Sequence, residues 1–371
     1  MRGALAILAC AALAACSTPS GPKPAELQPI PGAKPVRVLW SANVGAAERF
    51  TFTPAVVGEA VYAAARDGTV TRLDAATGAV RWRAETGTRL SAGVGADARV
   101  VVVATEQGEV IALDAASGAA RWRGRVSSEV LAPPAVGDGL VLVRSIDNRI
   151  FAFAGDDGGR RWVYHRPPAS LLMRSPAGMT LAGESALVGF SGGRLAALAL
   201  ANGAVRWEAS VAVPRGATEL ERVTDVVGEP AVQGREVCAA AYQGRVACYE
   251  QASGRPLWAR ELSSLTGVSL EARYALVSDD RGAVHALDRT TGRSLWKQDR
   301  LAHRHPSLPR TLGEAVAVGD FEGYVHFLAR DSGAFVARHA SGGGPVRAAP
   351  VALPAGVLVQ TQNGTLLALA L

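Results

Sequence analysis

The chain has 371 residues, of which 49% are hydrophobic, and it carries a formal net charge of +6. This length is ample for one large core or several smaller ones. The arginines that supply the charge are scattered singly, which favours a solvated surface over a nucleic-acid interface. Beyond the N-terminal leader, no uninterrupted apolar segment has the length of a transmembrane helix.

The N-terminal residues have the pattern of a bacterial lipoprotein leader. Residues 4–14 are apolar but too few to span a bilayer, and the small residues before Cys16 resemble a lipobox. An ordinary secretory signal with an incidental Cys16 is the alternative. Ser17, in place of Asp, is similar to the signal that directs lipoproteins to the outer membrane. We predict a signal peptide over residues 1–15, and a lipidated N-terminus with a flexible tether over residues 16–35.

Tryptophan recurs along the remaining chain at intervals of 38 to 51 residues. In six cases the Trp follows a Gly by four residues, and that Gly is usually preceded by Thr, Ser or Asn. A period near 40 residues with short apolar runs is typical of radial or stacked β-repeats. We expect each indole to pack as a flat plug between neighbouring units. The seven residues are Trp40, Trp82, Trp122, Trp162, Trp207, Trp258 and Trp296.

Residues 54–83 show one complete unit, with four short apolar or alternating runs separated by turn residues. Its Asp67-Gly68 pair marks a hairpin tip, because Gly accepts the positive φ of a tight turn. Helical repeats are excluded because no segment keeps a 3.6-residue period, and a linear solenoid is disfavoured because no polar capping unit is present. The sequence therefore predicts an all-β protein, a single eight-bladed propeller with four-stranded antiparallel blades over residues 36–371. The eight tips are residues 67–68, 107–108, 147–148, 192–193, 243–244, 281–282, 322–323 and 363–364.

The ends of the repeat array predict how the ring closes. The last unit, residues 349–371, contains three strands and stops before a Trp phrase, whereas residues 37–45 match the Trp segment of the first unit. An N-terminal strand that completes the last blade would remove the open edges of a linear array. The seventh unit has Ala337 in the Trp position, and Phe335 is the candidate to replace the missing indole.

Two cysteines flank the fifth hairpin tip, Cys238 on one side and Cys248 on the other. A three-residue loop would place them directly opposite each other, whereas a two-residue loop would place them on opposite faces. In an oxidising periplasm such a pair is a candidate disulfide, and two buried thiols are the alternative.

The repeated Asp-x-x-Thr/Ser-Gly-x-x-x-Trp phrase resembles the repeats of pyrroloquinoline-quinone dehydrogenases, which non-enzymatic relatives share. With a lipobox, a tether and a single propeller, the chain is similar to the BamB family, the lipoprotein subunits of the β-barrel assembly machine in the Gram-negative outer membrane. The resemblance implies a non-enzymatic scaffold without a cofactor, lipid-anchored on the periplasmic side of that membrane. Its partners would be the periplasmic domains of BamA, other subunits of the machine, and unfolded outer-membrane proteins.

The longest interval between tryptophans contains an insertion that strengthens this resemblance. In BamB proteins a matching segment, Gly-x-Thr-Glu-(Ile/Leu)-(Asp/Glu)-Arg-(Leu/Val)-x-Asp-Val-Asp, lies on the face that meets BamA. This chain matches from Gly216 to Val226 and has Val227 in place of the final Asp. Apolar contact from the Leu and Val and a charge-assisted hydrogen bond from the Arg are implied; a surface loop without a partner is the alternative. The implied contact residues are Glu219, Leu220, Glu221, Arg222, Val223 and Asp225.

Other functions are less well supported by the residues. A quinone dehydrogenase needs a calcium site and a catalytic base, but most aspartates of this chain occupy turn positions, and there is no adjacent Cys pair. A periplasmic ligand-binding propeller would gather aromatic residues on one face, and aromatics are only 6% of the chain. His303 and His305 before Pro306 are more typical of an exposed connection than of a metal site. We predict no catalytic residue and no metal ligand.

Overall fold

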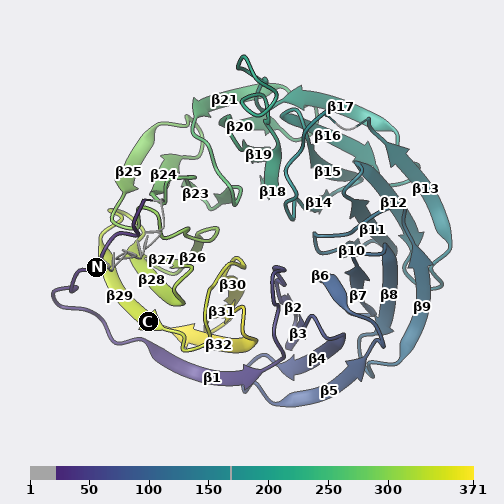
Figure 1. Cartoon of the computed structure of the whole chain (residues 1–371), viewed down its shortest axis with the longest axis horizontal. Helices are drawn as coiled ribbons and strands as arrows, with labels where there is room; N and C mark the ends of the chain where they lie inside the picture. The colour runs from purple at the N-terminus through teal and green to yellow at the C-terminus, as the bar shows by residue number, and fades with distance from the viewer. Residues whose placement is uncertain (1–21, 168) are drawn as a thin grey trace, which may run out of the picture.

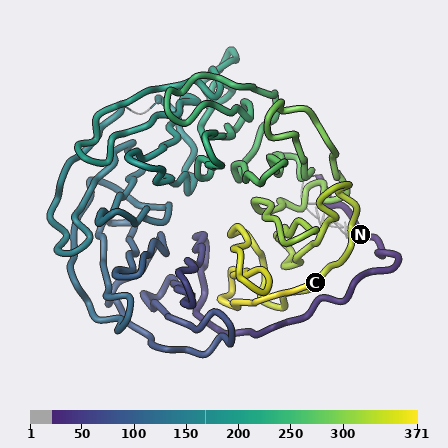
Figure 2. The backbone as a smooth tube through the Cα atoms, turned by 180° about the vertical axis from the view of Figure 1, so that it is seen from behind, coloured from purple at the N-terminus to yellow at the C-terminus, as the bar shows by residue number. Residues whose placement is uncertain are grey.

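The structure is a computed structural model that describes residues 22–167 and 169–371, so Cys16 and the signal peptide lie outside the described residues. It contains eight four-stranded antiparallel sheets that follow one another around a ring (Figures 1 and 2). Each sheet is one blade, and its strands run outward from the ring centre in chain order except in the last blade. The predicted eight-bladed propeller is confirmed.

Each blade contributes four strands, from the innermost to the outermost. Blades one and two consist of β2 (Ala55–Val57), β3 (Ala60–Ala64), β4 (Thr69–Asp74), β5 (Val80–Glu85), β6 (Leu90–Ala96), β7 (Val100–Thr105), β8 (Glu109–Asp114) and β9 (Ala120–Arg125). Blades three and four consist of β10 (Ala135–Gly137), β11 (Leu140–Ser145), β12 (Arg149–Ala154), β13 (Arg160–His165), β14 (Met179–Ala182), β15 (Ser185–Phe190), β16 (Arg194–Ala199) and β17 (Val205–Ser210). Blades five and six consist of β18 (Val226–Gln233), β19 (Glu236–Ala241), β20 (Arg245–Glu250), β21 (Pro256–Glu261), β22 (Ser269–Leu270), β23 (Tyr274–Ser278), β24 (Val284–Asp288) and β25 (Ser294–Gln298). Blades seven and eight consist of β26 (Arg310–Leu312), β27 (Ala315–Gly319), β28 (Tyr324–Ala329), β29 (Phe335–Ala340), β30 (Val351–Leu353), β31 (Gly356–Gln360), β32 (Thr365–Ala370) and β1 (Arg37–Asn43).

The last blade contains the N-terminal strand. Strand β1 pairs antiparallel with β32, and the order of the sheet is β1-β32-β31-β30. The pairing extends from Arg37 opposite Ala370 to Asn43 opposite Thr365. The predicted closure of the ring by the N-terminal strand is confirmed, and it leaves no blade with an unpaired third strand.

Antiparallel order divides the connections between two faces of the ring. One face, which we call the turn face, carries the turns from first to second and from third to fourth strands. The opposite face, which we call the loop face, carries the turns from second to third strands and all connections between blades. Most of these connections are short, but residues 211–225 join blades four and five, so the insertion belongs to the loop face.

The middle strands of each blade form the core because aliphatic side chains cover both of their faces. All six residues of β7 are buried, for example, whereas the outermost strand β9 alternates between exposed and covered positions. Runs of small and β-branched residues suit a strand packed between two neighbouring blades. The packed blades therefore fix the points at which the loops of both faces begin and end.

The turn between the third and fourth strands explains the repeated Asp. In blade two, Asp114 Oδ1 accepts hydrogen bonds from the amides of Ala116 at 3.1 Å and Ser117 at 2.9 Å. Gly118 follows with a φ of 76°, a conformation that side chains with a Cβ rarely adopt. These local bonds lower the pKa of Asp114, with the Ser117 amide as the first cause. The carboxylate is therefore used within its own turn.

Each tryptophan joins its blade to the next one. Trp122 Nε1 donates to the carbonyl of Gly155 in blade three at 2.9 Å, and a Cβ added to Gly158 would lie 2.7 Å from the indole. Gly is required at this position because the ring lies directly on the backbone of the turn. The same pair of contacts is made by all seven tryptophans.

The seam between blades seven and eight has no indole for a structural reason. Ala337 occupies the Trp position, since it pairs with Phe327 as Trp162 pairs with Ala152. In blade eight the third and fourth strands, β32 and β1, are not joined by a turn, so there is no turn Gly on which an eighth indole could pack. Phe335 does not replace it, because its ring packs with the cluster between blades six and seven.

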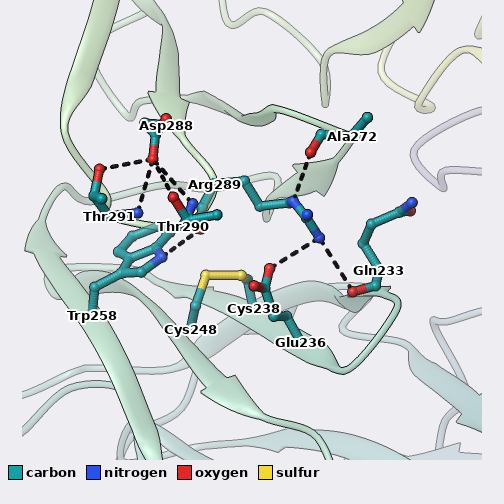
Figure 3. The surroundings of a disulfide bond; sticks show 10 residues. All are labelled: Gln233, Glu236, Cys238, Cys248, Trp258, Ala272, Asp288, Arg289, Thr290 and Thr291. Atoms are coloured by element: carbon teal, nitrogen blue, oxygen red, sulfur yellow. Dashed lines mark hydrogen bonds and ion pairs between the residues drawn. A yellow bond between two sulfur atoms is a disulfide. The ribbon is translucent and has the colours of Figure 1, made fainter.

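A disulfide lies inside blade five. Cys238 and Cys248 are directly opposite each other in β19 and β20, with Cα atoms 4.0 Å apart, and their sulfurs are bonded (Figure 3). The three residues between the two strands give the register that places the pair opposite each other. Cys248 is also opposite Trp258 in the neighbouring strand β21, and Trp258 Nε1 donates to the carbonyl of Arg289 at 2.6 Å.

Candidate partner-binding surface

The insertion folds into one short turn that is organised by its own polar residues. Thr218 Oγ1 accepts from the amide of Glu221 at 3.3 Å, and Glu221 Oε2 accepts from the amides of Thr218 at 3.0 Å and Ala217 at 2.8 Å. This reciprocal pattern is a capping box. The two main-chain bonds, that of Thr218 first, lower the pKa of Glu221.

Arg222 helps to hold the same turn. Its Nε donates to the carbonyl of Gly216 at 3.0 Å, and its Nη1 lies 3.4 Å from the carboxylate of Glu219. Gly216 has a φ of 134°, and a Cβ there would lie 2.3 Å from the Cβ of Glu221. The side chain is half-exposed, and two of its nitrogens, Nε and Nη1, contact groups of the turn.

Two of the implied contact residues lie inside the protein. Asp225 is 5% exposed, and its carboxylate accepts from the amides of Met173 at 2.6 Å and Gly192 at 3.2 Å. Burial raises the pKa of Asp225, although these two bonds and nearby Arg144 oppose the shift. Val223 is 8% exposed. Asp225 therefore joins its own connection to the one that contains Met173 and to the hairpin tip that contains Gly192. Its burial is inconsistent with a direct contact with a partner.

Leu220 stands out from the turn and exposes 71% of its surface. It borders a hollow of about 570 Å³ on the loop face, together with side chains from the connections and hairpin tips of blades three to six. Leu171 and Leu265, exposed by 46% and 39%, belong to the same hollow. Exposed aliphatic side chains that gather around a concave surface are typical of a protein interface. The lining residues are Leu171, Leu172, Met173, Leu220, Val223, Tyr242, Leu265, Asp280 and Arg281.

The neighbouring hairpin tip fixes the insertion at the hollow. With its amide oriented to satisfy its neighbours, Gln243 donates to the carbonyls of Glu221 and Val223, both at 3.0 Å. The backbone of Gln243 has a φ of 47°, the left-handed conformation that a tight turn requires. The insertion and the tip of blade five are thus hydrogen-bonded to each other, and Tyr242 of the tip lines the same hollow.

Val227 is the one residue that departs from the BamB-like motif, because it stands in place of the final Asp. It lies in β18, is 1% exposed and pairs with Ala240 of β19. The departure therefore changes the packing of blade five and leaves the exposed surface of the turn unchanged.

The remaining candidate residues are not part of this surface. His305 is exposed against the ring of Phe321, with centroids 5.8 Å apart, and His303 is half-buried nearby. Across residues 22–167 and 169–371, no group of three His, Cys, Asp or Glu side chains is placed to hold a metal ion. Nor does that part of the chain contain a helix long and apolar enough to cross a membrane.

Known proteins are similar to the chain over nearly its whole length. The family described as outer membrane protein assembly factor BamB matches residues 33–88 and 66–298. The BamB of Bordetella pertussis is 46% identical over 370 residues, which cover 98% of this chain and 96% of that protein. The chain belongs to the BamB family. The BamB of Pseudomonas aeruginosa is 44% identical over 98% of this chain and 96% of its own length.

Solved structures agree with membership of the BamB family. The crystal structure of BamB from Moraxella catarrhalis superposes with a TM-score of 0.83 at 28% identity, and the match covers 91% of this chain and 100% of that one. Quinohemoprotein alcohol dehydrogenase from Comamonas testosteroni superposes with a TM-score of 0.70 at 14% identity, over 90% of this chain and 76% of that one. The second likeness shows the shared propeller fold alone.

Proposed function

We propose that this chain is a lipid-anchored, non-enzymatic scaffold that assists the folding and insertion of outer-membrane β-barrel proteins. Its curated relatives are named outer membrane protein assembly factor BamB, which supports a role in that process. The lipobox-like residues before Cys16 support an anchor in the outer membrane, with the propeller on the periplasmic side. In this proposal the protein acts by binding other proteins and uses no cofactor.

The hollow on the loop face is the observation that carries the proposal. Leu220, Leu171 and Leu265 expose apolar surface around it, while Glu221 and Arg222 bond groups of their own turn. A rigid turn loses little conformational entropy on binding, so its apolar side chain can contribute most of its burial to affinity. We propose that the periplasmic domains of BamA bind at this hollow, with Leu220 inserted into a complementary groove.

The outer edges of the blades offer a second mode of contact within the same function. Strands such as β5 and β9 lie at the rim of the ring and are paired on one side only (Figure 1). Main-chain pairing tolerates many sequences, which suits unfolded outer-membrane proteins or other subunits of the assembly machine.

A pull-down of the lipidated protein from its native membrane, with partners identified by mass spectrometry, tests this function. We expect BamA among the co-purified proteins and a lipid on the peptide that begins at Cys16. A preparation that lacks BamA but oxidises alcohols or sugars when pyrroloquinoline quinone and Ca²⁺ are added would instead support an enzyme. Recovery of neither partner nor activity would also contradict the proposal.

A further inference from the structure

Residues 22–36, which we call the strap, cross the outer edge of blade seven before the chain enters β1. The amide of Ala25 donates to the carbonyl of Ala302 on the loop face at 2.9 Å, and the amide of Lys34 donates to Val336 in β29 at 2.8 Å. Figure 1 shows this purple segment beside β27 to β29 and then outside the ring on its way to β1. The strap therefore runs from the loop face to the turn face.

Two arginines bind carbonyl groups of the strap, one from the connection that leads into blade seven and one from β29. Arg304, which is 2% exposed, donates through Nη1 to Ala25 at 2.9 Å, and Arg338 donates through Nη2 to Gln28 at 3.3 Å. Bonds from a guanidinium to main-chain carbonyls are charge-assisted and independent of the side chains of the strap.

A buried pair of residues orients both arginines. Arg304 Nε donates to Asp320 at 2.7 Å, and Arg338 Nε donates to His326 Nδ1 at 3.2 Å. His326 Nε2 lies 2.9 Å from the same carboxylate of Asp320, and neither residue of the pair is exposed. The two donors that hold the strap are thus preorganised by the interior of the blade.

The strap also makes an apolar contact and a turn of its own. Leu27 packs against the cluster between blades six and seven that contains Trp296 and Phe335. Between its two ends, the amide of Ala33 donates to Ile30 at 3.2 Å across a Pro-Gly turn in which Gly32 has a φ of 65°. Val36, at the end of the strap, packs against the cluster between blades seven and eight, so within residues 22–34 Leu27 makes the apolar contact with a core cluster. Few apolar contacts and a few hydrogen bonds are typical of a segment that opens at low free-energy cost.

We propose that blade seven carries a groove that binds residues 22–34 reversibly, and that this binding sets the length of the N-terminal anchor. Pro22 follows Cys16 by six positions. A docked strap therefore limits the anchor to about 20 Å, whereas release up to β1 extends it to about 70 Å. Pro22 and Pro24 line a cavity of about 700 Å³ together with loop-face connections, Pro306 among them. Docking therefore keeps the loop face close to the membrane, and this consequence rests on the proposed lipidation of Cys16.

Proteolysis with an endoprotease that cuts before lysine tests the docking itself in the full mature chain. The sequence contains only three lysines, Lys23, Lys34 and Lys297, and Lys297 lies within β25. We expect the Ala33–Lys34 bond to be cut about tenfold more slowly in the native protein than in Leu27→Ser, because cleavage follows the population of the released strap. Glu26→Gln, at an exposed neighbouring position, is the matched control and should behave like the wild type.

Both substitutions lie on the strap and outside the ring, so tryptophan fluorescence should show an intact propeller in each variant. Equal cleavage rates for the wild type, Leu27→Ser and a free peptide of residues 22–38 would overturn the proposal. Slow cleavage in all folded variants, Leu27→Ser included, would also overturn it, since the strap would then be permanently fixed.

Neutron reflectometry of the lipidated protein on a bilayer of phosphatidylethanolamine and phosphatidylglycerol tests the anchor length. The propeller of Leu27→Ser should extend farther from the bilayer than that of the wild type, by up to about 50 Å. Equal distances would contradict the two-length anchor. Absence of a lipid on Cys16 by mass spectrometry would instead contradict the proposed function, while the proteolysis result would still decide the docking.

Discussion

On the turn face a carboxylate such as Asp114 bonds only the residues that follow it, whereas on the loop face Asp225 bonds the amides of Met173 and Gly192 in other connections. The first arrangement can repeat in each blade whose third and fourth strands are joined, because each turn is complete in itself. The second depends on three connections of different length meeting at one point. The turns between third and fourth strands therefore repeat one local arrangement, whereas the connections between blades on the loop face differ in length from blade to blade.

The residues that stabilise the ring differ from those that the proposed binding requires. The tryptophans hold neighbouring blades together and the Asp turns stabilise the individual blades, and these residues are buried or bonded within the ring. The loop face exposes Leu171, Leu220 and Leu265 around a hollow. Substitutions in the first group should lower stability, and substitutions in the second should change binding.

The largest effect on stability is expected at a seam. Trp162→Ala removes a buried indole and its 2.7 Å hydrogen bond to Leu200 in the next blade. The free energy of unfolding should fall by about 3–5 kcal/mol, measured by urea denaturation. Val163→Ala, at the exposed neighbouring position, is the control and should stay close to the wild type. A similar value for both variants would contradict the role of the seam.

A smaller effect is expected from pH at the loop-face end of blade seven. Burial lowers the pKa of His326, despite its hydrogen bond with Asp320. The unfolded chain therefore takes up a proton first as the pH falls below the ordinary value of 6.5, and stability is lost at up to about 1.4 kcal/mol per pH unit. The thermal midpoint at pH 5.5 and pH 7.5 should differ less in His326→Gln than in the wild type. If the thermal midpoint changes equally with pH in both proteins, His326 is not the cause of the pH dependence.

The smallest effect is expected on the turn face. Asp114→Ala deletes the acceptor of two main-chain amides in an exposed turn, and it should lower the free energy of unfolding by about 1 kcal/mol. Co-purification of partner proteins should be unaffected, because the turn lies on the opposite face from the hollow. If Asp114→Ala no longer co-purified with partner proteins, the turn face would also contribute to binding, which contradicts the proposed division between the two faces.

The regular part of the fold was predictable because its causes are local and repeated. The Trp spacing, the eight hairpin tips and the match between residues 37–45 and the first unit indicated the blade number and the closure. Ala337 was recognised as a departure, but its reason required the structure, since it depends on β32 and β1 not being joined by a turn.

The proposed contact surface was predictable only in part. The insertion was identified, and Leu220 is exposed as expected, but Asp225 and Val223 are buried. Leu171 and Leu265 were missed, because they come from connections whose relative positions no local pattern reveals. One signal was overlooked: Thr218-x-x-Glu221 is the sequence pattern of a capping box, which predicts that Glu221 stabilises its own turn.

The central claim is that the hollow on the loop face binds the assembly machine through Leu220. The most direct measurement is the amount of BamA that co-purifies with full-length Leu220→Asp, compared with Leu257→Asp at an exposed apolar position on the rim of blade five. We predict a loss of about tenfold or more for Leu220→Asp, wild-type recovery for Leu257→Asp, and unchanged thermal unfolding for both. Wild-type recovery of BamA with Leu220→Asp would contradict the account.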